Sequence, residues 1–185
     1  RYSFGVVRTT HDQNLVLPDV AIDDLYTLWL SLGDLGLATA NIGTLTNMIC
    51  CPGLEFCGLA NAESISIARQ INDRFDDLDY LHDLGDVRVK ISGCMNACGH
   101  HHVGHIGVLG VDKKGEEWYQ ITIGGSAEEF TRLGKRIGPS VAKSDVAKTV
   151  DSLLQVYLDQ RLEDESFPAT VDRIGLNPFK ERVYG

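Results

Sequence analysis

The chain has 185 residues, 43% of them hydrophobic, and a formal net charge of −9 at pH 7. This apolar content suffices for a packed core, and no apolar run approaches the roughly 20 residues that a membrane-spanning helix needs. The acidic balance argues against nucleic acid as a partner, so we expect a cytoplasmic protein that binds neither nucleic acid nor membrane.

The first forty residues predict two short strands followed by one helix. Residues 4–9 and 14–18 are rich in Val and Leu, and His11-Asp12 between them is typical of a turn. Residues 22–32 predict an amphipathic helix, which begins at Asp23-Asp24 and ends before Gly33. Its apolar residues have helical spacing and form one stripe: Leu25, Leu28, Trp29 and Leu32. We place a domain boundary near residue 40, which gives domains 1–40 and 41–185.

The second domain alternates helices and strands, so the whole chain is expected to be α+β. Asn61 is the predicted N-cap of a helix over residues 62–78. A strand over 87–91 leads directly to Cys94. Further strands are predicted at 108–111 and 118–123, joined by a turn at 113–115, and a last helix at 144–162.

Four of the five cysteines form two close pairs, Cys51-x5-Cys57 and Cys94-x3-Cys98. Turn-forming residues accompany each pair, namely Pro52-Gly53 in the first and Gly93 and Gly99 around the second. A 4Fe-4S cluster needs four thiolates that converge from such loops. The alternatives are a structural zinc site, two disulfides, or unrelated buried thiols. The spacing differs from that of zinc ribbons, and an odd cysteine count disfavours disulfides; we take Cys50 as a buried neighbour of the ligands.

Two further groups of polar residues lie close to the second cysteine pair. Alternation along the strand before Cys94 is expected to put Arg88 and Lys90 on one face, where they could bind anionic groups or simply face solvent. Four histidines follow the pair: His100, His101, His102 and His105. They could bind a metal ion, relay protons, or only form hydrogen bonds with the backbone.

The cysteine pattern resembles the sirohaem and 4Fe-4S signature of the assimilatory nitrite and sulfite reductases. In that family, Cys-x5-Cys is likewise followed some forty residues later by Cys-x3-Cys. The similarity extends to residues 9–17 (TTHDQNLVL), to Leu59-Ala60 and to residues 104–108 (GHIGV). It also includes residues 173–175 (RIG) and 178–180 (PFK) near the end of the chain.

The resemblance implies a fold, an activity and a set of partners. It implies half of a ferredoxin-like (parachute-type) sandwich in residues 1–40, then an α/β domain that binds the 4Fe-4S cluster and sirohaem. The implied reaction is the six-electron reduction of sulfite to sulfide, or of nitrite to ammonia. Electrons would come from a ferredoxin or a flavoprotein subunit. Because family members are longer, we expect a C-terminal fragment, inactive alone, whose N-terminal half is a further partner. A cluster-only electron carrier and a zinc-binding module remain alternatives.

The resemblance also assigns individual residues. Cys51, Cys57, Cys94 and Cys98 are the implied metal ligands, and Cys98 is the one shared with the sirohaem iron. Asn96 matches the family's Asn in the second loop, whereas Met95 and Ala97 stand where some members have Pro and Gly. Candidates for binding the sirohaem are Arg8, Gln13 and Asn14, although Gln13-Asn14 could simply hold a turn together. Arg88 and Lys90 are the candidate catalytic cations.

Overall fold

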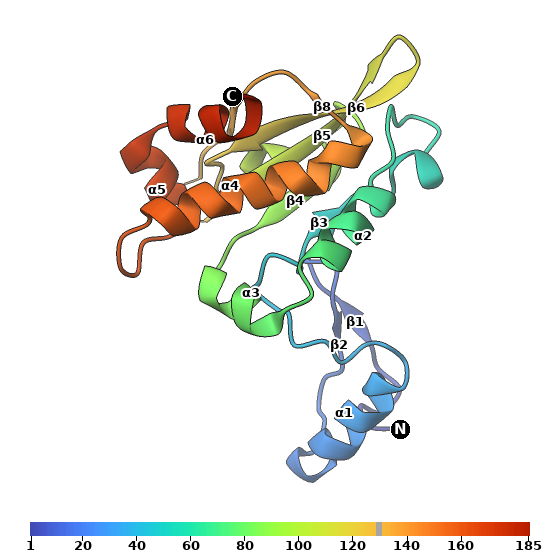
Figure 1. Cartoon of the computed structure of the whole chain (residues 1–185). Coiled ribbons are helices and arrows are strands. Elements are labelled where there is room, and N and C mark those ends of the chain that lie inside the picture. Colours follow the sequence, from blue (N-terminus) through green and yellow to red (C-terminus); the bar gives the residue numbers. More distant parts are fainter. Residues whose placement is uncertain (129–130) are drawn as a thin grey trace. The chain divides into compact units, whose positions relative to one another are not determined.

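The computed structural model describes residues 1–128 and 131–185. The chain forms two compact units, Arg1–Asn41 and Ile42–Gly185, which are described separately below (Figure 1). Within the described residues, no helix is both long enough and apolar enough to cross a membrane.

The first unit is a short hairpin followed by a helix. Strands β1 (Arg8–Thr9) and β2 (Leu15–Val16) pair antiparallel, and a 3-10 turn η1 (Ile22–Asp24) leads into helix α1 (Leu25–Gly33). The hairpin turn closes through hydrogen bonds between Thr10 and Asn14, and Gln13 adopts a left-handed conformation with φ 60°. Both predicted strands are present but shorter than expected, and the predicted helix is present.

The apolar stripe of α1 is not buried within this unit. None of the helix residues is buried, and Leu25, Tyr26 and Trp29 are all more than half exposed. A unit of 41 residues is too small to cover such a stripe with a core of its own. The expectation that this unit is half of a ferredoxin-like sandwich stays a prediction.

The second unit is built on a six-stranded mixed sheet. Its strands are β3 (Ile49–Cys50), β4 (Val89–Ser92), β5 (Ile106–Lys113), β6 (Glu116–Ile123), β7 (Lys135–Arg136) and β8 (Val141–Ala142). The sheet order is β3-β4-β5-β6-β7, with β8 also paired to β6. Strands β3, β4 and β5 run parallel, whereas β5 and β6 form an antiparallel hairpin around the predicted turn at residues 113–115. The parallel part therefore lies at one side of the sheet.

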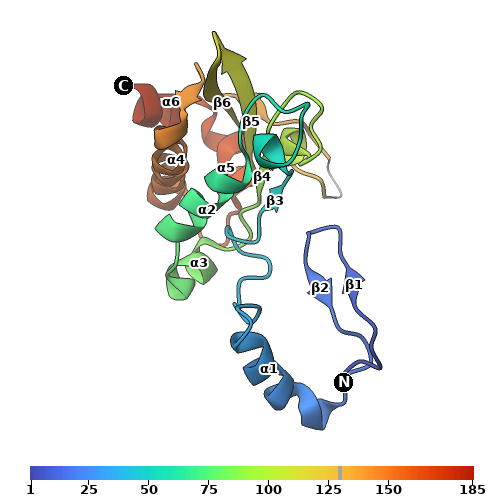
Figure 2. The same cartoon turned by 90° about the vertical axis from the view of Figure 1, so that its right-hand side faces the viewer.

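Helices cover the sheet and enclose the core. They are α2 (Ile65–Arg74), α3 (Leu78–Leu84), α4 (Val146–Gln160), α5 (Phe167–Ile174) and α6 (Asn177–Tyr184), with 3-10 turns η2 (Gly53–Glu55), η3 (His101–Val103) and η4 (Lys143–Asp145). Figure 2 shows α4 and α6 on one side of the sheet. Between the sheet and the helices lie fully buried side chains such as Tyr119, Ile121, Leu153 and Phe167.

The predicted helix over residues 62–78 is wrong in its extent. Helix α2 ends at Arg74, and a separate helix α3 begins at Leu78. The Asp77 carboxylate accepts hydrogen bonds from two backbone amides of the first turn of α3, which is the N-cap arrangement. At the start of α2, Asn61 is not the cap. The Glu55 carboxylate instead accepts hydrogen bonds from the amides of Ser64 and Ser66, so a distant side chain replaces the expected local cap.

The alternative in which Arg88 and Lys90 both face solvent is wrong for Lys90. Strand β4 lies between β3 and β5, and all four of its residues are buried. Lys90 belongs to this buried strand and is only 7% exposed, whereas Arg88 precedes the strand and is exposed. Lys90 is buried because a central parallel strand is covered on both faces.

Two glycines bring the chain segments after β3 and β4 into direct contact. A Cβ added at Gly93 would lie 2.5 Å from the Ala62 carbonyl oxygen and 3.0 Å from the Gly53 Cα. Gly93 also accepts two hydrogen bonds at its carbonyl, from the amides of Asn61 (2.9 Å) and Ala62 (3.0 Å). The backbone at Gly93 therefore has no room for any side chain.

We predict that Gly93→Ala destabilises the metal-free chain by about 2–3 kcal/mol, because the added methyl group would overlap rigid backbone. Urea unfolding would measure the loss. Gly58→Ala is the matched control, since a Cβ there meets nothing within 4 Å. Equal unfolding midpoints for the two variants would show that the close approach at Gly93 is not required.

Candidate metal centre

Both cysteine loops begin at the carboxyl ends of neighbouring parallel strands. Cys51 follows β3 directly, and Cys94 comes two residues after β4. The ladder pairs Cys50 with Ile91, and the Cys51 amide extends it by donating to the Ile91 carbonyl at 3.1 Å. Because parallel strands point the same way, both loops emerge at one edge of the sheet, where open α/β sheets commonly bind ligands.

The first loop turns back on itself through η2. The Cys57 amide donates to the Gly53 carbonyl at 2.8 Å, which closes one helical turn between the two cysteines. Gly53 has φ 64°, a left-handed conformation that favours glycine. Cys51 is buried at the strand end and Cys57 is half-buried on the far side of the turn.

The second loop is equally tight. The Ala97 amide donates to the Cys94 carbonyl at 3.1 Å, and the Gly99 amide donates to the Ser92 hydroxyl at 3.1 Å. Ala97 has φ 56°, which explains why glycine suits this position: a left-handed alanine costs about 1 kcal/mol. The substitution strains the loop but leaves Cys94 buried and Cys98 exposed.

The two loops are joined at the Cys51 sulfur. The Gly93 amide, which immediately precedes Cys94, donates to the Cys51 Sγ at 3.1 Å. Backbone amides that donate to ligand sulfurs are a common feature of iron–sulfur sites. Each loop thus offers one buried and one more accessible cysteine. The loop surface also exposes apolar side chains: Leu54, Phe56, Leu59 and Met95.

The residues present fit a four-iron cluster better than a single metal ion. Across residues 1–128 and 131–185, no three Cys, His, Asp or Glu side chains lie close enough together to hold one ion. A 4Fe-4S cluster does not need such a group, because each of its four thiolates binds a different iron. All five cysteines are free in this structure.

Cys50 differs from the other four cysteines. Burial, with the nearby Cys51 and Glu55, raises the pKa of its thiol to about 12. Its Sγ lies 3.2 Å from the Cys51 carbonyl oxygen, to which it donates. Cys50 is partly buried and packs against the hydrophobic core, which agrees with a packing role for this residue.

The candidate cations have separate environments. The Arg88 guanidinium pairs with Asp86 at 2.8 Å and with Glu128 at 3.4 Å, while Lys90 is buried in β4.

The candidate sirohaem-binding residues of the first unit lie on its hairpin. Arg8 lies on β1 and is exposed, and Gln13 and Asn14 form the hairpin turn. The structure thus places Gln13-Asn14 in a turn, which is compatible with either role. A cofactor role for these residues stays a prediction, as does that of Asn96, which is exposed in the second loop.

The four histidines divide into two exposed and two buried residues. His100 and His102 are exposed, whereas His101 and His105 are 1% and 3% exposed. The His105 Nδ1 accepts a hydrogen bond from the Arg88 amide, which leaves its Nε2 protonated and the ring neutral. Among the described residues, the His101 Nδ1 and the His105 Nε2 have no hydrogen-bond partner. Both rings are buried, and in the part of the chain that the structure describes no metal-binding group includes either of them.

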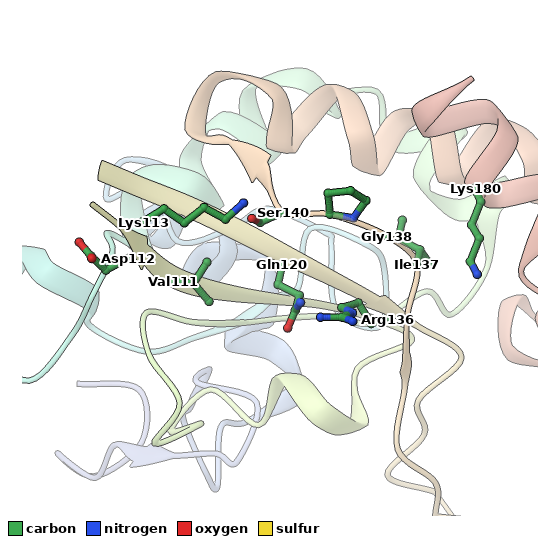
Figure 3. A pocket seen from close by; sticks show the side chains of 10 residues that line it. Val111, Asp112, Lys113, Gln120, Arg136, Ile137, Gly138, Ser140 and Lys180 are labelled. Carbon is green, nitrogen blue, oxygen red and sulfur yellow. The ribbon is translucent and has the colours of Figure 1, made fainter. Parts of the chain in front are cut away.

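Several residues near the cysteines had no sequence signal. Glu55 lies within the first cysteine loop and accepts a hydrogen bond from the Ser64 amide, and the Ser64 hydroxyl lies beside the Cys51 sulfur. The sequence also did not predict a cavity of about 650 Å³, whose lining residues include the cations Lys113, Arg136 and Lys180 (Figure 3). None of its lining residues belongs to either cysteine loop, so it is separate from the candidate metal centre.

We predict that His101 makes the metal-free chain sensitive to acid. Burial and the neighbouring His102 lower the pKa of His101 to about 4. The unfolded chain binds a proton near pH 6.5 and the folded chain does not, so this contribution to stability is complete above pH 6.5. It is lost progressively as the pH falls from 6.5 to 4, by a total on the order of 3 kcal/mol.

Urea unfolding across this pH range would measure the effect. The His101→Gln variant should have a shallower slope of the unfolding free energy against pH, and the slope that remains should include the part due to the buried His105, whose pKa is also lowered by burial. A variant of the exposed His82, His82→Gln, should keep the full slope. An unchanged slope in His101→Gln would show that another group causes the acid sensitivity.

Comparison with known proteins shows the family to which this chain belongs. Residues 42–185 match the model of the family described as nitrite and sulphite reductase 4Fe-4S domain. The sulfite reductase [NADPH] hemoprotein beta-component of Methylobacterium nodulans is 29% identical over 173 residues, which cover 92% of this chain and 28% of that protein. The protein of the same name from Bacillus licheniformis is 27% identical and covers 93% and 30%. The chain thus spans less than a third of these curated relatives.

Solved structures show the same similarity. The Mycobacterium tuberculosis NirA protein superposes with a TM-score of 0.79 at 25% identity, over 94% of this chain and 33% of that one. Dissimilatory sulfite reductase I has a TM-score of 0.82 over 97% of this chain and 62% of its own, but at 13% identity it supports the fold alone. With most of its length matched by the family model, this chain belongs to the nitrite and sulphite reductase 4Fe-4S domain family.

Proposed function

We propose that Cys51, Cys57, Cys94 and Cys98 hold a 4Fe-4S cluster in a sirohaem-dependent reductase. The observation that carries the proposal is the placement of Cys51 and Cys94 at the ends of two adjacent parallel strands, within a domain whose family is named for this cluster. The Gly93 amide at the Cys51 sulfur supports it further. When bound, the cluster supplies single electrons to the reacting centre.

The unequal exposure of the cysteines suggests separate roles. Cys51 and Cys94 are buried, and burial excludes water from their sulfurs. Cys98 is exposed, so its thiolate can be shared with a second cofactor outside the loop. We propose sirohaem as this cofactor, with Asn96 beside it in the same loop. The exposed side chains of Phe56, Leu59 and Met95 suit the apolar surface of a macrocycle.

The proposed substrate is sulfite, reduced by six electrons to sulfide, with reduction of nitrite to ammonia as the alternative. Both substrates are anions, and the chain is acidic overall. Lys90, Arg88 and Arg8 are the cations that we propose for binding the substrate or the sirohaem carboxylates. The curated relatives are named for the sulfite reaction, which favours that substrate.

The working enzyme is proposed to need more protein than this chain. The chain spans 28–30% of the first curated relatives, and the stripe of α1 is exposed within its own unit. We propose that a segment equivalent to the rest of those relatives covers this stripe and completes the sirohaem pocket. Electrons would come from a ferredoxin or a flavoprotein subunit. We place the enzyme in the cytoplasm, where reducing conditions keep cluster thiols free.

We predict that the anaerobically prepared chain binds about four irons with acid-labile sulfide and absorbs broadly near 400 nm. Single Ser variants of the four proposed ligands should lose most of this iron. Cys50→Ser should retain all of it, because Cys50 belongs to strand β3 and packs against the core. Iron, sulfide and zinc assays with an absorption spectrum would check both statements.

A colourless chain that contains zinc instead of iron would contradict the proposal. Loss of iron in Cys50→Ser, with retention in Cys51→Ser, would assign the ligands differently. A brown chain with normal iron content that never binds sirohaem, even within the complete enzyme, would favour the cluster-only electron carrier.

For the complete enzyme that contains this chain, we predict that Cys98→Ser lowers the rates of both sulfite and nitrite reduction at least 100-fold. The reason is that the thiolate shared between the two cofactors is lost. Steady-state rates with a reduced viologen dye would measure the effect and rank the two substrates. Cys50→Ser is the control and should remain within about twofold of the natural enzyme.

A further inference from the structure

A buried hydroxyl group lies directly beside the Cys51 sulfur. Ser64 precedes helix α2 and is fully buried, and its Oγ is 3.5 Å from the Cys51 Sγ. The same sulfur accepts a hydrogen bond from the Gly93 amide at 3.1 Å. The sulfur therefore has two polar neighbours, one from the start of α2 and one from the loop after β4.

The Ser64 hydroxyl occupies a slot between two glycines. A Cβ added at Gly53 would lie 2.8 Å from the Ser64 Oγ, and one added at Gly93 would lie 2.9 Å from it. Any larger residue at either position would overlap the hydroxyl. The slot is therefore made by the two cysteine loops together, and it exists only when both are in place.

The backbone of Ser64 is held on both sides. Its amide donates to the Glu55 carboxylate at 3.0 Å, and its carbonyl accepts a hydrogen bond from the Ala68 amide at 3.0 Å. In the described part of the chain, the hydroxyl has no hydrogen-bond partner other than the Cys51 sulfur. A fixed backbone and a single partner aim the hydroxyl at that sulfur.

Chemistry sets the direction of this hydrogen bond. In the metal-free chain either the thiol or the hydroxyl can donate. A cysteine that ligates iron is a thiolate, which has no proton and can only accept. With metal bound, Ser64 must therefore donate to Cys51.

We propose that Ser64 is a positioning residue that raises the reduction potential of the 4Fe-4S cluster by donating to the Cys51 thiolate. This inference rests on the proposed function, because it requires Cys51 to be a ligand. One electron from a reduced mediator makes the cluster more negative, and a donor at a ligand sulfur stabilises that added charge. Removal of the donor should make reduction less favourable without removing a ligand.

The test is a redox titration of the loaded chain, followed by the EPR signal of the reduced cluster. Ser64→Ala removes only the hydroxyl oxygen, and its reduction equilibrium constant should fall three- to tenfold, where tenfold equals 59 mV for one electron. Ser92→Ala is the matched control. It also removes a buried serine hydroxyl beside a cysteine loop, but that hydroxyl accepts from the Gly99 amide and has no sulfur partner in the described residues.

A lower potential in Ser64→Ala alone, with four irons in all three proteins, supports the inference. An unchanged potential in Ser64→Ala, or an equal fall in both variants, overturns it, because a general change of packing would then explain the result. Should Ser64→Ala fail to bind iron, Ser64→Thr decides, since it restores the hydroxyl. If Ser64→Thr binds four irons and has the reduction potential of the natural chain, the inference is supported. If neither variant binds iron, the inference is overturned, because the size of the side chain at position 64 would then explain the result.

The two proposals fail in different ways. A natural chain that binds no iron removes the proposed function and, with it, the role of Ser64. A natural chain that binds four irons, with a potential that does not respond to Ser64→Ala, removes only the role of Ser64.

Discussion

The parallel pairing of β3 with β4 determines where the candidate metal centre can form. Strand β3 has only two residues, yet its register with β4 places Cys50 opposite Ile91 and extends to the Cys51 amide. Two loops of unrelated sequence therefore begin at the same edge of the sheet. Because β4 is buried between β3 and β5, this edge is anchored in the core, and the accessible cysteines lie on loops held by a rigid base.

Close backbone contact between the loops follows from this pairing. Gly53 and Gly93 approach each other because neither has a side chain, and the space between them holds the Ser64 hydroxyl. Glu55 links the same loop to the start of α2 by accepting two amide hydrogen bonds. We therefore expect a change at any of these four residues to alter the surroundings of the Cys51 sulfur, although none of them is a proposed ligand.

The polarity of the second unit is distributed unevenly. Near the cysteines, the buried polar groups are neutral histidines and serines, apart from Lys90 in β4. The exposed loop surface around them is apolar, with Phe56, Leu59 and Met95 in solvent. In the first unit, α1 likewise exposes its apolar stripe. Exposed apolar surface of this kind is typical of regions that contact a cofactor or another protein segment.

The sequence by itself determined what depends on local pattern. The cysteine pairs, the glycines beside them, the hairpin around residues 113–115 and the stripe of α1 were predicted because each depends on neighbouring residues. The tertiary structure alone decided the rest. Lys90 is buried because β4 is central, α2 is capped by Glu55 rather than Asn61, and Ser64 meets Cys51 across 13 residues. These features arise from contacts between distant segments, and periodicity carries no information about which segments will meet.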